Sequence, residues 1–132
     1  MEEMTIGQLA KKAAVNLETI RYYERRGLVP DPPRNKRGHR IYSREALKRI
    51  KFIKRSQTLG FSLKEISELL SLRVEPGTTC GDIKIRVEAK IVDIEKKITD
   101  LEKMRMALMR MSDKCMDKEP VGQCPILEAL YK

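Results

Sequence analysis

The chain of 132 residues contains three cysteines, Cys80, Cys115 and Cys124, and a single histidine, His39. An odd number of cysteines argues against a framework of structural disulfides and leaves free thiols, redox chemistry or metal binding. The C-x-x-C spacing typical of thiol-redox proteins is missing. Each cysteine alone could be a small buried apolar residue, but three thiols without a neighbouring histidine suit a soft metal ion.

The cysteines lie at the two ends of one long segment with helical spacing. Residues 74–81, with Pro76 and Gly77, are the expected linker, and residues 82–112 the expected helix. Residues 113–132 are predicted to form a metal-binding loop and a short C-terminal helix. The apolar residues of the long helix follow a heptad pattern at Val87, Ile91, Ile94, Ile98, Leu101 and Leu108. So narrow a stripe favours pairing with a second copy; the alternative is a helix folded against its own front half.

A helix of about thirty residues is roughly 45 Å long, so Cys80 cannot meet Cys115 within one chain. An antiparallel homodimer removes this conflict, because it brings Cys80 of one protomer beside Cys115 and Cys124 of the other and creates two identical shared sites. Structural zinc usually has four ligands, often including histidine. Three sulfurs alone therefore favour Hg(II), or else Pb(II) or Cd(II), over Zn(II).

The excess of positive over negative charge lies in the front half of the chain. Residues 1–73 hold 17 Lys and Arg against 8 Asp and Glu, whereas residues 74–132 hold 11 of each kind. This distribution predicts a front half that binds nucleic acid, although surplus lysines can also serve solubility alone. The start of the chain lacks the apolar run of a targeting sequence, and no segment reaches the length of a membrane span. We therefore expect a cytoplasmic protein without membrane contact.

Helix signals divide the front half into four helices with an irregular segment between the second and third. Capping residues predict helices that begin after Thr5, Asn16, Ser43 and Ser62. Three prolines and a glycine turn exclude a helix from Val29 to Ser43 and favour a small basic hairpin. We therefore predict an all-α fold with a small β wing, in which residues 1–73 form a winged helix-turn-helix domain followed by a long antiparallel coiled-coil dimerisation helix.

The second helix of a helix-turn-helix enters the major groove of DNA, and a basic wing can reach phosphates or the minor groove. On this basis the second helix supplies Thr19, Arg21, Tyr22 and Tyr23 as candidate DNA contacts, and the wing supplies Arg34, Arg37, His39 and Arg40. The alternatives are that the arginines form a solvated face and that the tyrosines belong to the core.

Four segments resemble the MerR family of bacterial transcriptional regulators. They are TIGQLAKKAAVNLETIRYYERRGL from Thr5, RNKRGHRIYS from Arg34, FIKRSQTLGFSLKEISELL from Phe52, and CPILEAL from Cys124. The placement of Cys80, Cys115 and Cys124 is similar to that of the mercury-responsive branch, and the lead-responsive branch shares this spacing. Copper-responsive members lack the first cysteine and zinc-responsive members add further ligands. His39 departs from the tyrosine usual at its position.

The resemblance implies a homodimer, not an enzyme, that represses from a double-stranded operator in the absence of metal. Binding of Hg(II) as the effector would then distort and untwist the DNA, so that RNA polymerase can start transcription of a mercury-resistance operon. Three alternatives remain from the sequence: a Pb(II) or Cd(II) sensor of the same architecture, a thiol-redox sensor or enzyme, and a constitutive architectural DNA-binding protein.

Overall fold

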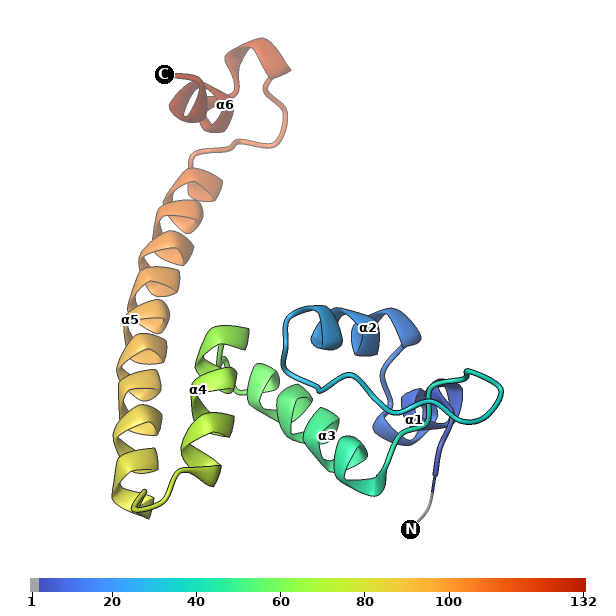
Figure 1. The fold of residues 1–132 in the computed structure, drawn as a ribbon. Helices are drawn as coiled ribbons and strands as arrows, with labels where there is room; N and C mark the ends of the chain where they lie inside the picture. Colours follow the sequence, from blue (N-terminus) through green and yellow to red (C-terminus); the bar gives the residue numbers. More distant parts are fainter. Residues whose placement is uncertain (1–2) are drawn as a thin grey trace. The chain divides into compact units, whose positions relative to one another are not determined.

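The computed structural model describes residues 3–132, which are mostly helical (Figure 1). The helices are α1 (Ile6–Ala13), α2 (Leu17–Arg25), α3 (Arg44–Thr58), α4 (Leu63–Val74), α5 (Cys80–Asp113) and α6 (Pro125–Tyr131), with a 3-10 turn, η1 (Val121–Gln123). β-structure in the described residues is limited to the isolated bridges Met4–Tyr42 and Arg34–Arg40. The predicted all-α fold is confirmed. The chain divides into two compact units, one ending at Lys84 and the other beginning at Ile85.

The front unit is built from helices whose first turns are closed by the expected capping side chains. Thr5 and Gln8 exchange reciprocal side-chain to backbone hydrogen bonds at the start of α1, and Ser62 and Glu65 do so at the start of α4. The side chain of Asn16 accepts a hydrogen bond from the Thr19 amide at 2.7 Å, which begins α2. These caps satisfy amides that have no partner within the helix, and the predicted starts are confirmed.

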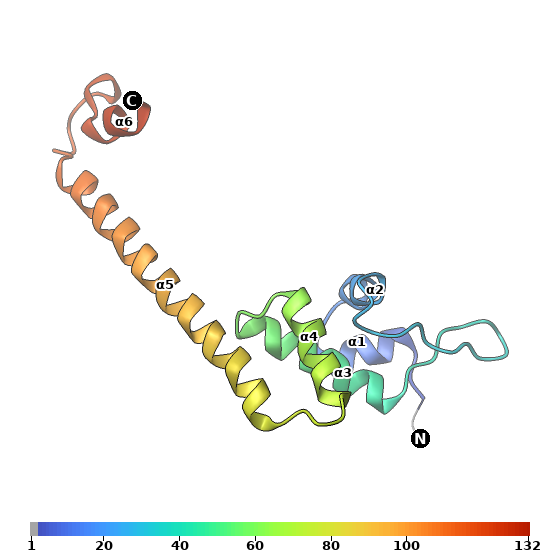
Figure 2. The same ribbon diagram turned by 60° about the vertical axis from the view of Figure 1, so that its left-hand side comes forward.

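The core of the front unit consists of side chains from α1 to α4 and from the chain on both sides of the wing. Figures 1 and 2 show these four helices grouped together. Leu9, Ile20, Ile50, Ile53 and Ile66 are completely buried in it. The turn between α1 and α2 passes through Ala14 in a left-handed conformation, with φ 56°. Lys54 of α3 donates a hydrogen bond from Nζ to the Ala14 carbonyl at 2.5 Å. This contact ties the helix-turn-helix to the next helix of the core.

The expected hairpin is a hydrogen-bonded turn with very little strand. The Asn35 amide donates to the His39 carbonyl at 2.8 Å, and the Ile41 amide donates to the Pro33 carbonyl at 2.9 Å. Gly38 takes φ 82° at the turn, a conformation in which a residue with a Cβ would be strained. The prolines before the turn cannot donate hydrogen bonds, which limits the ladder to isolated bridges.

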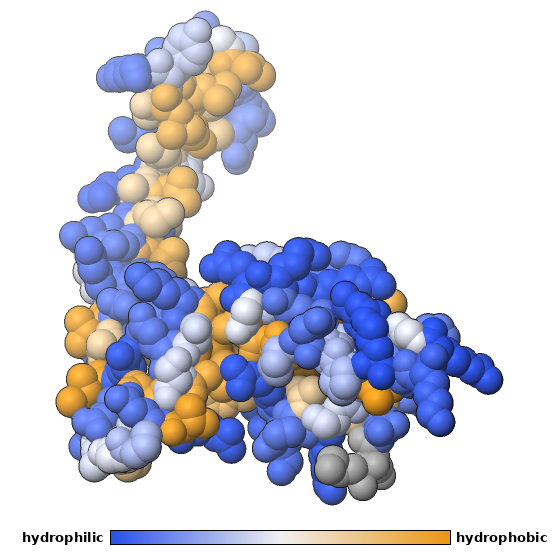
Figure 3. Space-filling view, in the orientation of Figure 1, coloured by the Kyte–Doolittle hydropathy of each residue, from blue (hydrophilic) through white to orange (hydrophobic). Residues whose placement is uncertain are grey.

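Helix α5 begins at Cys80 and not at residue 82, so Cys80 lies in its first turn and not in the linker. The reason is a capping pair: the Thr79 amide donates to Asp82 Oδ2 at 2.9 Å, and the Asp82 amide donates to Thr79 Oγ1 at 3.3 Å. Most apolar side chains along α5 are exposed, including Ile91 at 48%, Ile98 at 60% and Leu101 at 60% (Figure 3).

Residues after α5 form a turn, η1 and the short helix α6. Asp117 takes φ 68° in this turn, and Cys124 stands at the start of α6 with Pro125 as its first residue. Proline is favoured there because its missing N–H would have no partner in the helix anyway. No helix among residues 3–132 is long and apolar enough to cross a lipid bilayer.

Candidate DNA interface and metal ligands

Helix α2 presents a basic and aromatic surface. Arg21 and Tyr22 are exposed, and Arg21 forms an ion pair with Glu18 at 2.8 Å. The guanidinium groups of Arg25 and Arg26 each lie 5.8 Å from the centre of the Tyr22 ring. Such cation–π contacts restrain long side chains without neutralising their positive charge. Arg21 and Tyr22 are therefore accessible, as a groove-binding helix requires.

Two other candidate DNA contacts on α2, Thr19 and Tyr23, form side-chain hydrogen bonds within the protein. Thr19 is half-buried, and its hydroxyl donates to Asn16 Oδ1 at 2.8 Å as part of the helix cap. Tyr23 is 3% exposed, its hydroxyl donates to Gln57 Oε1 at 2.6 Å, and burial raises the pKa of its phenol. The assignment of Tyr23 as a DNA contact is therefore corrected: helical spacing turns its ring toward α3, into the core.

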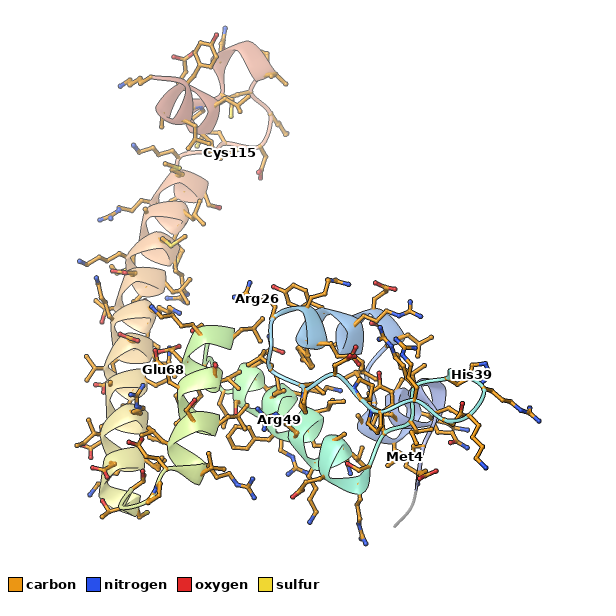
Figure 4. The ribbon with its side chains drawn as sticks, in the orientation of Figure 1. Met4, Arg26, His39, Arg49, Glu68 and Cys115 are labelled. Atoms are coloured by element: carbon orange, nitrogen blue, oxygen red, sulfur yellow. The ribbon has the colours of Figure 1, made fainter. Side chains whose placement is uncertain are left out.

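The wing exposes Arg34, Arg37 and His39, and His39 lies at the far end of the loop in Figure 4. Asn35 organises this turn, because its Oδ1 accepts hydrogen bonds from the Arg37 amide at 2.9 Å and the His39 amide at 3.0 Å. Arg34 donates to the Gly38 carbonyl at 3.0 Å and closes the loop from the other side. The basic side chains thus project from a loop with defined internal bonds.

Arg40 differs from the other wing arginines because it is paired within the fold. Its guanidinium donates to Glu24 Oε2 at 2.7 Å, and the other oxygen of Glu24 accepts a hydrogen bond from the Tyr42 hydroxyl. The hydrogen bond with Tyr42 and the charge of Glu24 raise the pKa of Arg40 further. Arg40 therefore belongs to the base of the wing.

The structure brings several predicted DNA contacts together in one groove between α2 and the wing. Arg21, Arg34, His39 and Arg40 line this groove, with Thr5 and Ile6 at the start of α1. Tyr22 and Arg37 are exposed but do not line it. The result is a continuous basic surface across two elements that are separate in sequence.

Glu24 and Asn35 form hydrogen bonds that organise the candidate interface, and the sequence analysis missed both. Glu24 is an acidic residue within a strongly basic stretch, and that isolation was the available signal for a paired carboxylate. Asn35, placed before a glycine turn, is typical of a side chain that bonds to the backbone two residues further on.

The three cysteines carry free thiols and do not meet within one chain. Cys80 is exposed in the first turn of α5, whereas Cys115 and Cys124 are half-buried after its end, where Figure 4 marks Cys115. Helix α5 has 34 residues, so its ends are about 50 Å apart at 1.5 Å per residue. Among residues 3–132 no three His, Cys, Asp or Glu side chains are grouped closely enough to hold a metal ion.

The loop around Cys115 is nevertheless ordered by local bonds. The Asp117 amide donates a hydrogen bond to Cys115 Sγ at 3.3 Å, and the Met116 amide donates to Glu119 Oε1 at 3.2 Å. A backbone N–H directed at sulfur suits a thiolate ligand, since hydrogen bonds around a metal ligand fix its orientation. The donor set of three soft sulfurs fits a thiophilic metal ion, provided that a second chain completes it.

Comparisons with known proteins agree with this architecture. The family model described as MerR HTH family regulatory protein matches residues 4–72, and a second model, described as MerR, DNA binding, matches residues 47–111. The chain belongs to the MerR family. This membership makes it a DNA-binding transcriptional regulator and not an enzyme, as the sequence analysis predicted.

Several relatives within the family are named for mercury resistance or were solved with a metal ion. The chain is 45% identical over 127 residues to the mercuric resistance operon regulatory protein of Bacillus cereus, covering 96% of each chain. A Bacillus megaterium regulator solved with a mercury(II) ion is 40% identical with a TM-score of 0.74, covering 98% of this chain and 100% of that one. A Ralstonia metallidurans regulator solved with lead(II) is 36% identical with a TM-score of 0.83, covering 96% and 98%. The chain is a metal-responsive regulator.

Proposed function

We propose that this protein represses a mercury-resistance operon in its metal-free form and activates it when Hg(II) binds. Each ion would be held by Cys80 of one protomer and by Cys115 and Cys124 of the other. The similarity to mercuric resistance regulators at 45% identity supports this choice of metal. The need to keep three thiols reduced supports the cytoplasm as its location.

The observation that carries the proposal is the position of the three cysteines relative to α5. One thiol stands in the first turn of the helix and the other two follow its last residue. In an antiparallel pair of α5 helices, the start of each helix would lie beside the end of the other. The exposed apolar side chains of α5 supply a surface for this pairing. Metal binding and dimer geometry are then coupled, because neither chain alone holds a complete site.

The proposed DNA side of the mechanism uses the groove between α2 and the wing. Arg21 and Tyr22 would read base edges in the major groove, while Arg34, Arg37 and His39 would hold phosphates beside it. A dimer presents two such surfaces to an operator with matching symmetry. Cys80 of one chain and Cys115 and Cys124 of the other would hold the ion, which would link the two chains at both ends of the α5 pair. Such a coupling can supply the few kcal/mol needed to untwist DNA for RNA polymerase.

Titration of the dimer with Hg(II) in excess small thiol tests the site. We expect saturation at two ions per dimer, accompanied by a thiolate charge-transfer absorption band. The variant Cys80→Ser should lose most of the affinity, because two sulfurs then remain at each site. Full affinity in this variant would exclude the three-sulfur site.

A mixture of variants tests whether the ligands come from different chains. Neither Cys80→Ser nor the double variant Cys115→Ser, Cys124→Ser has a complete site as a homodimer. A heterodimer of the two should regain one complete site, because the intact Cys80 of one chain faces the intact pair of the other. No recovery in verified heterodimers would contradict the shared geometry.

A Pb(II) or Cd(II) sensor is the second candidate, and the likeness to a regulator solved with lead(II) favours it. Three thiolates accept all of these soft ions, so the donor set alone does not separate them. Reporter induction and competition among Hg(II), Pb(II), Cd(II) and Zn(II) at matched free concentrations decide the question. Stronger induction by lead than by mercury would replace our first choice.

A further inference from the structure

We propose that Glu24 is a positioning residue that fixes the wing against α2, so that both elements meet DNA as one rigid surface. The inference rests on the proposed DNA-binding function of this groove and assigns a role to a residue that would not itself touch DNA. Its side chain is 10% exposed and lies among cations, where a carboxylate would otherwise weaken phosphate binding.

The two oxygens of Glu24 bind two residues that follow the wing turn, Arg40 and Tyr42. Oε2 accepts from the Arg40 guanidinium at 2.7 Å, and Oε1 accepts from the Tyr42 hydroxyl. Residues two apart in an extended chain lie on the same face, so a single carboxylate from α2 can bind both side chains. Both oxygens are thereby used in holding the wing.

Both partners of Glu24 are themselves anchored. Tyr42 is 1% exposed, and its backbone exchanges two hydrogen bonds with Met4, at 2.9 and 2.8 Å. Arg40 forms the bridge to Arg34 on the opposite side of the wing. A displacement of α2 is therefore transmitted through Glu24 to both sides of the wing. The groove lined by Arg21, Arg34 and His39 keeps its shape only while this connection holds.

The direction in which one substitution changes the affinity for DNA distinguishes this positioning role from a purely electrostatic effect of the carboxylate. Removing a negative charge beside a phosphate-binding surface should strengthen DNA binding, whereas removing a positioning residue should weaken it. Glu24→Gln keeps the shape of the side chain and removes its charge. Glu45→Gln, at an exposed position of α3, makes the same change of charge away from the groove and serves as the matched control.

Binding is measured by fluorescence anisotropy on a duplex that the wild-type dimer selects from a random pool, and on a scrambled duplex. We expect Glu24→Gln to bind the selected duplex at least about tenfold more weakly, because a buried charged hydrogen-bond partner of Arg40 is lost. The loss of affinity for the scrambled duplex should be smaller. Glu45→Gln should bind both duplexes as tightly as wild type or tighter. Amide hydrogen exchange in residues 35–39 should accelerate in Glu24→Gln alone.

Equal or tighter binding of the selected duplex by Glu24→Gln, with unchanged exchange in the wing, would overturn the inference. If Glu24→Gln does not fold, Tyr42→Phe and Arg40→Gln replace it, since each removes one of the two bonds. Their losses on the selected duplex should exceed those on the scrambled duplex, and equal losses would overturn the inference. Failure of the wild-type protein to select any sequence would count against the proposed function instead.

Discussion

Ala14 carries the turn between α1 and α2 in a left-handed conformation that residues with a Cβ adopt at a cost. We predict that Ala14→Gly raises the free energy of unfolding by ~0.5 to 1 kcal/mol, because glycine takes this φ without strain although it is more flexible in the unfolded chain. Urea denaturation measures the change. Ala10→Gly, inside helix α1, is the control and should lower stability by about 1 kcal/mol.

Tyr42 gives the fold a defined response to alkaline pH. Burial, followed by the hydrogen bond to Glu24, raises the pKa of Tyr42 from 10.0 to about 12. The folded state favours the neutral phenol. The stabilisation that Tyr42 gives to the folded state is therefore complete below pH 10 and is lost as the pH rises toward about 12. We expect the free energy of unfolding to fall across this window, as measured by urea denaturation at a series of pH values. Tyr42→Phe should reduce the decline, leaving the part that belongs to Tyr23, whose pKa burial also raises.

Substitution of either of two arginines on opposite sides of the groove should weaken DNA binding, but in different ways. We predict that Arg21→Ala weakens binding of the selected duplex and relaxes sequence preference by roughly 1 to 3 kcal/mol, since it would read base edges. Arg34→Ala should chiefly reduce the slope of log affinity against log salt by about one. Because Arg34 also closes the wing through the Gly38 carbonyl, hydrogen exchange of the loop is measured as a control. An equal loss on scrambled DNA for Arg21→Ala would assign this residue to phosphate contact.

At the scale of elements, local signals predicted most of the fold and tertiary contacts explain the exceptions. Thr5, Asn16, Ser43 and Ser62 begin helices as expected, because a cap acts within one turn of the chain. The burial of Tyr23 could not be predicted in this way, since its partner Gln57 is 34 residues away. For the same reason the bonds of Glu24 to the wing emerged only from the structure.

The cap of α5 offers a test that joins an element to its function. Thr79→Ala removes the hydroxyl that accepts from the Asp82 amide, and we expect fraying of the turn that holds Cys80. The predicted results are a loss of about 1 kcal/mol in stability and weaker Hg(II) binding, measured by urea denaturation and by competition with a small thiol. Ser62→Ala removes the equivalent cap of α4 and should lower stability without changing metal affinity. Similar metal affinity in the two variants would show that the start of α5 does not position Cys80.

At the scale of the whole molecule, the separation of charge matches the separation of tasks. All of the net charge of +9 comes from residues 1–73, which contain the groove, whereas the remainder is neutral and carries the thiols and the exposed stripe of α5. A nearly neutral helix with apolar side chains would pair with a copy of itself with little repulsion, while the basic front halves remain available for DNA. The sequence predicted this division, but a single chain supplies only one or two of the three thiols of each proposed metal site.

The dependence of the metal site on pairing leads to a prediction about the assembly. Ile98 is 60% exposed on the stripe of α5, and Ile98→Lys would place a charge at the centre of the proposed contact. We expect sedimentation velocity to show a shift from dimer to monomer, because burial of an unpaired charge opposes association.

In the same variant the charge-transfer band with Hg(II) should disappear although all three cysteines remain, and affinity for the selected duplex should fall as well. Lys97→Ala, next to Ile98 on the polar flank, is the control and should retain the dimer and both ions. A monomeric Ile98→Lys that still binds Hg(II) through three sulfurs would place the whole site in one chain. The helix between Cys80 and Cys115 would then have to break, since its length of about 50 Å keeps these thiols apart while it is intact.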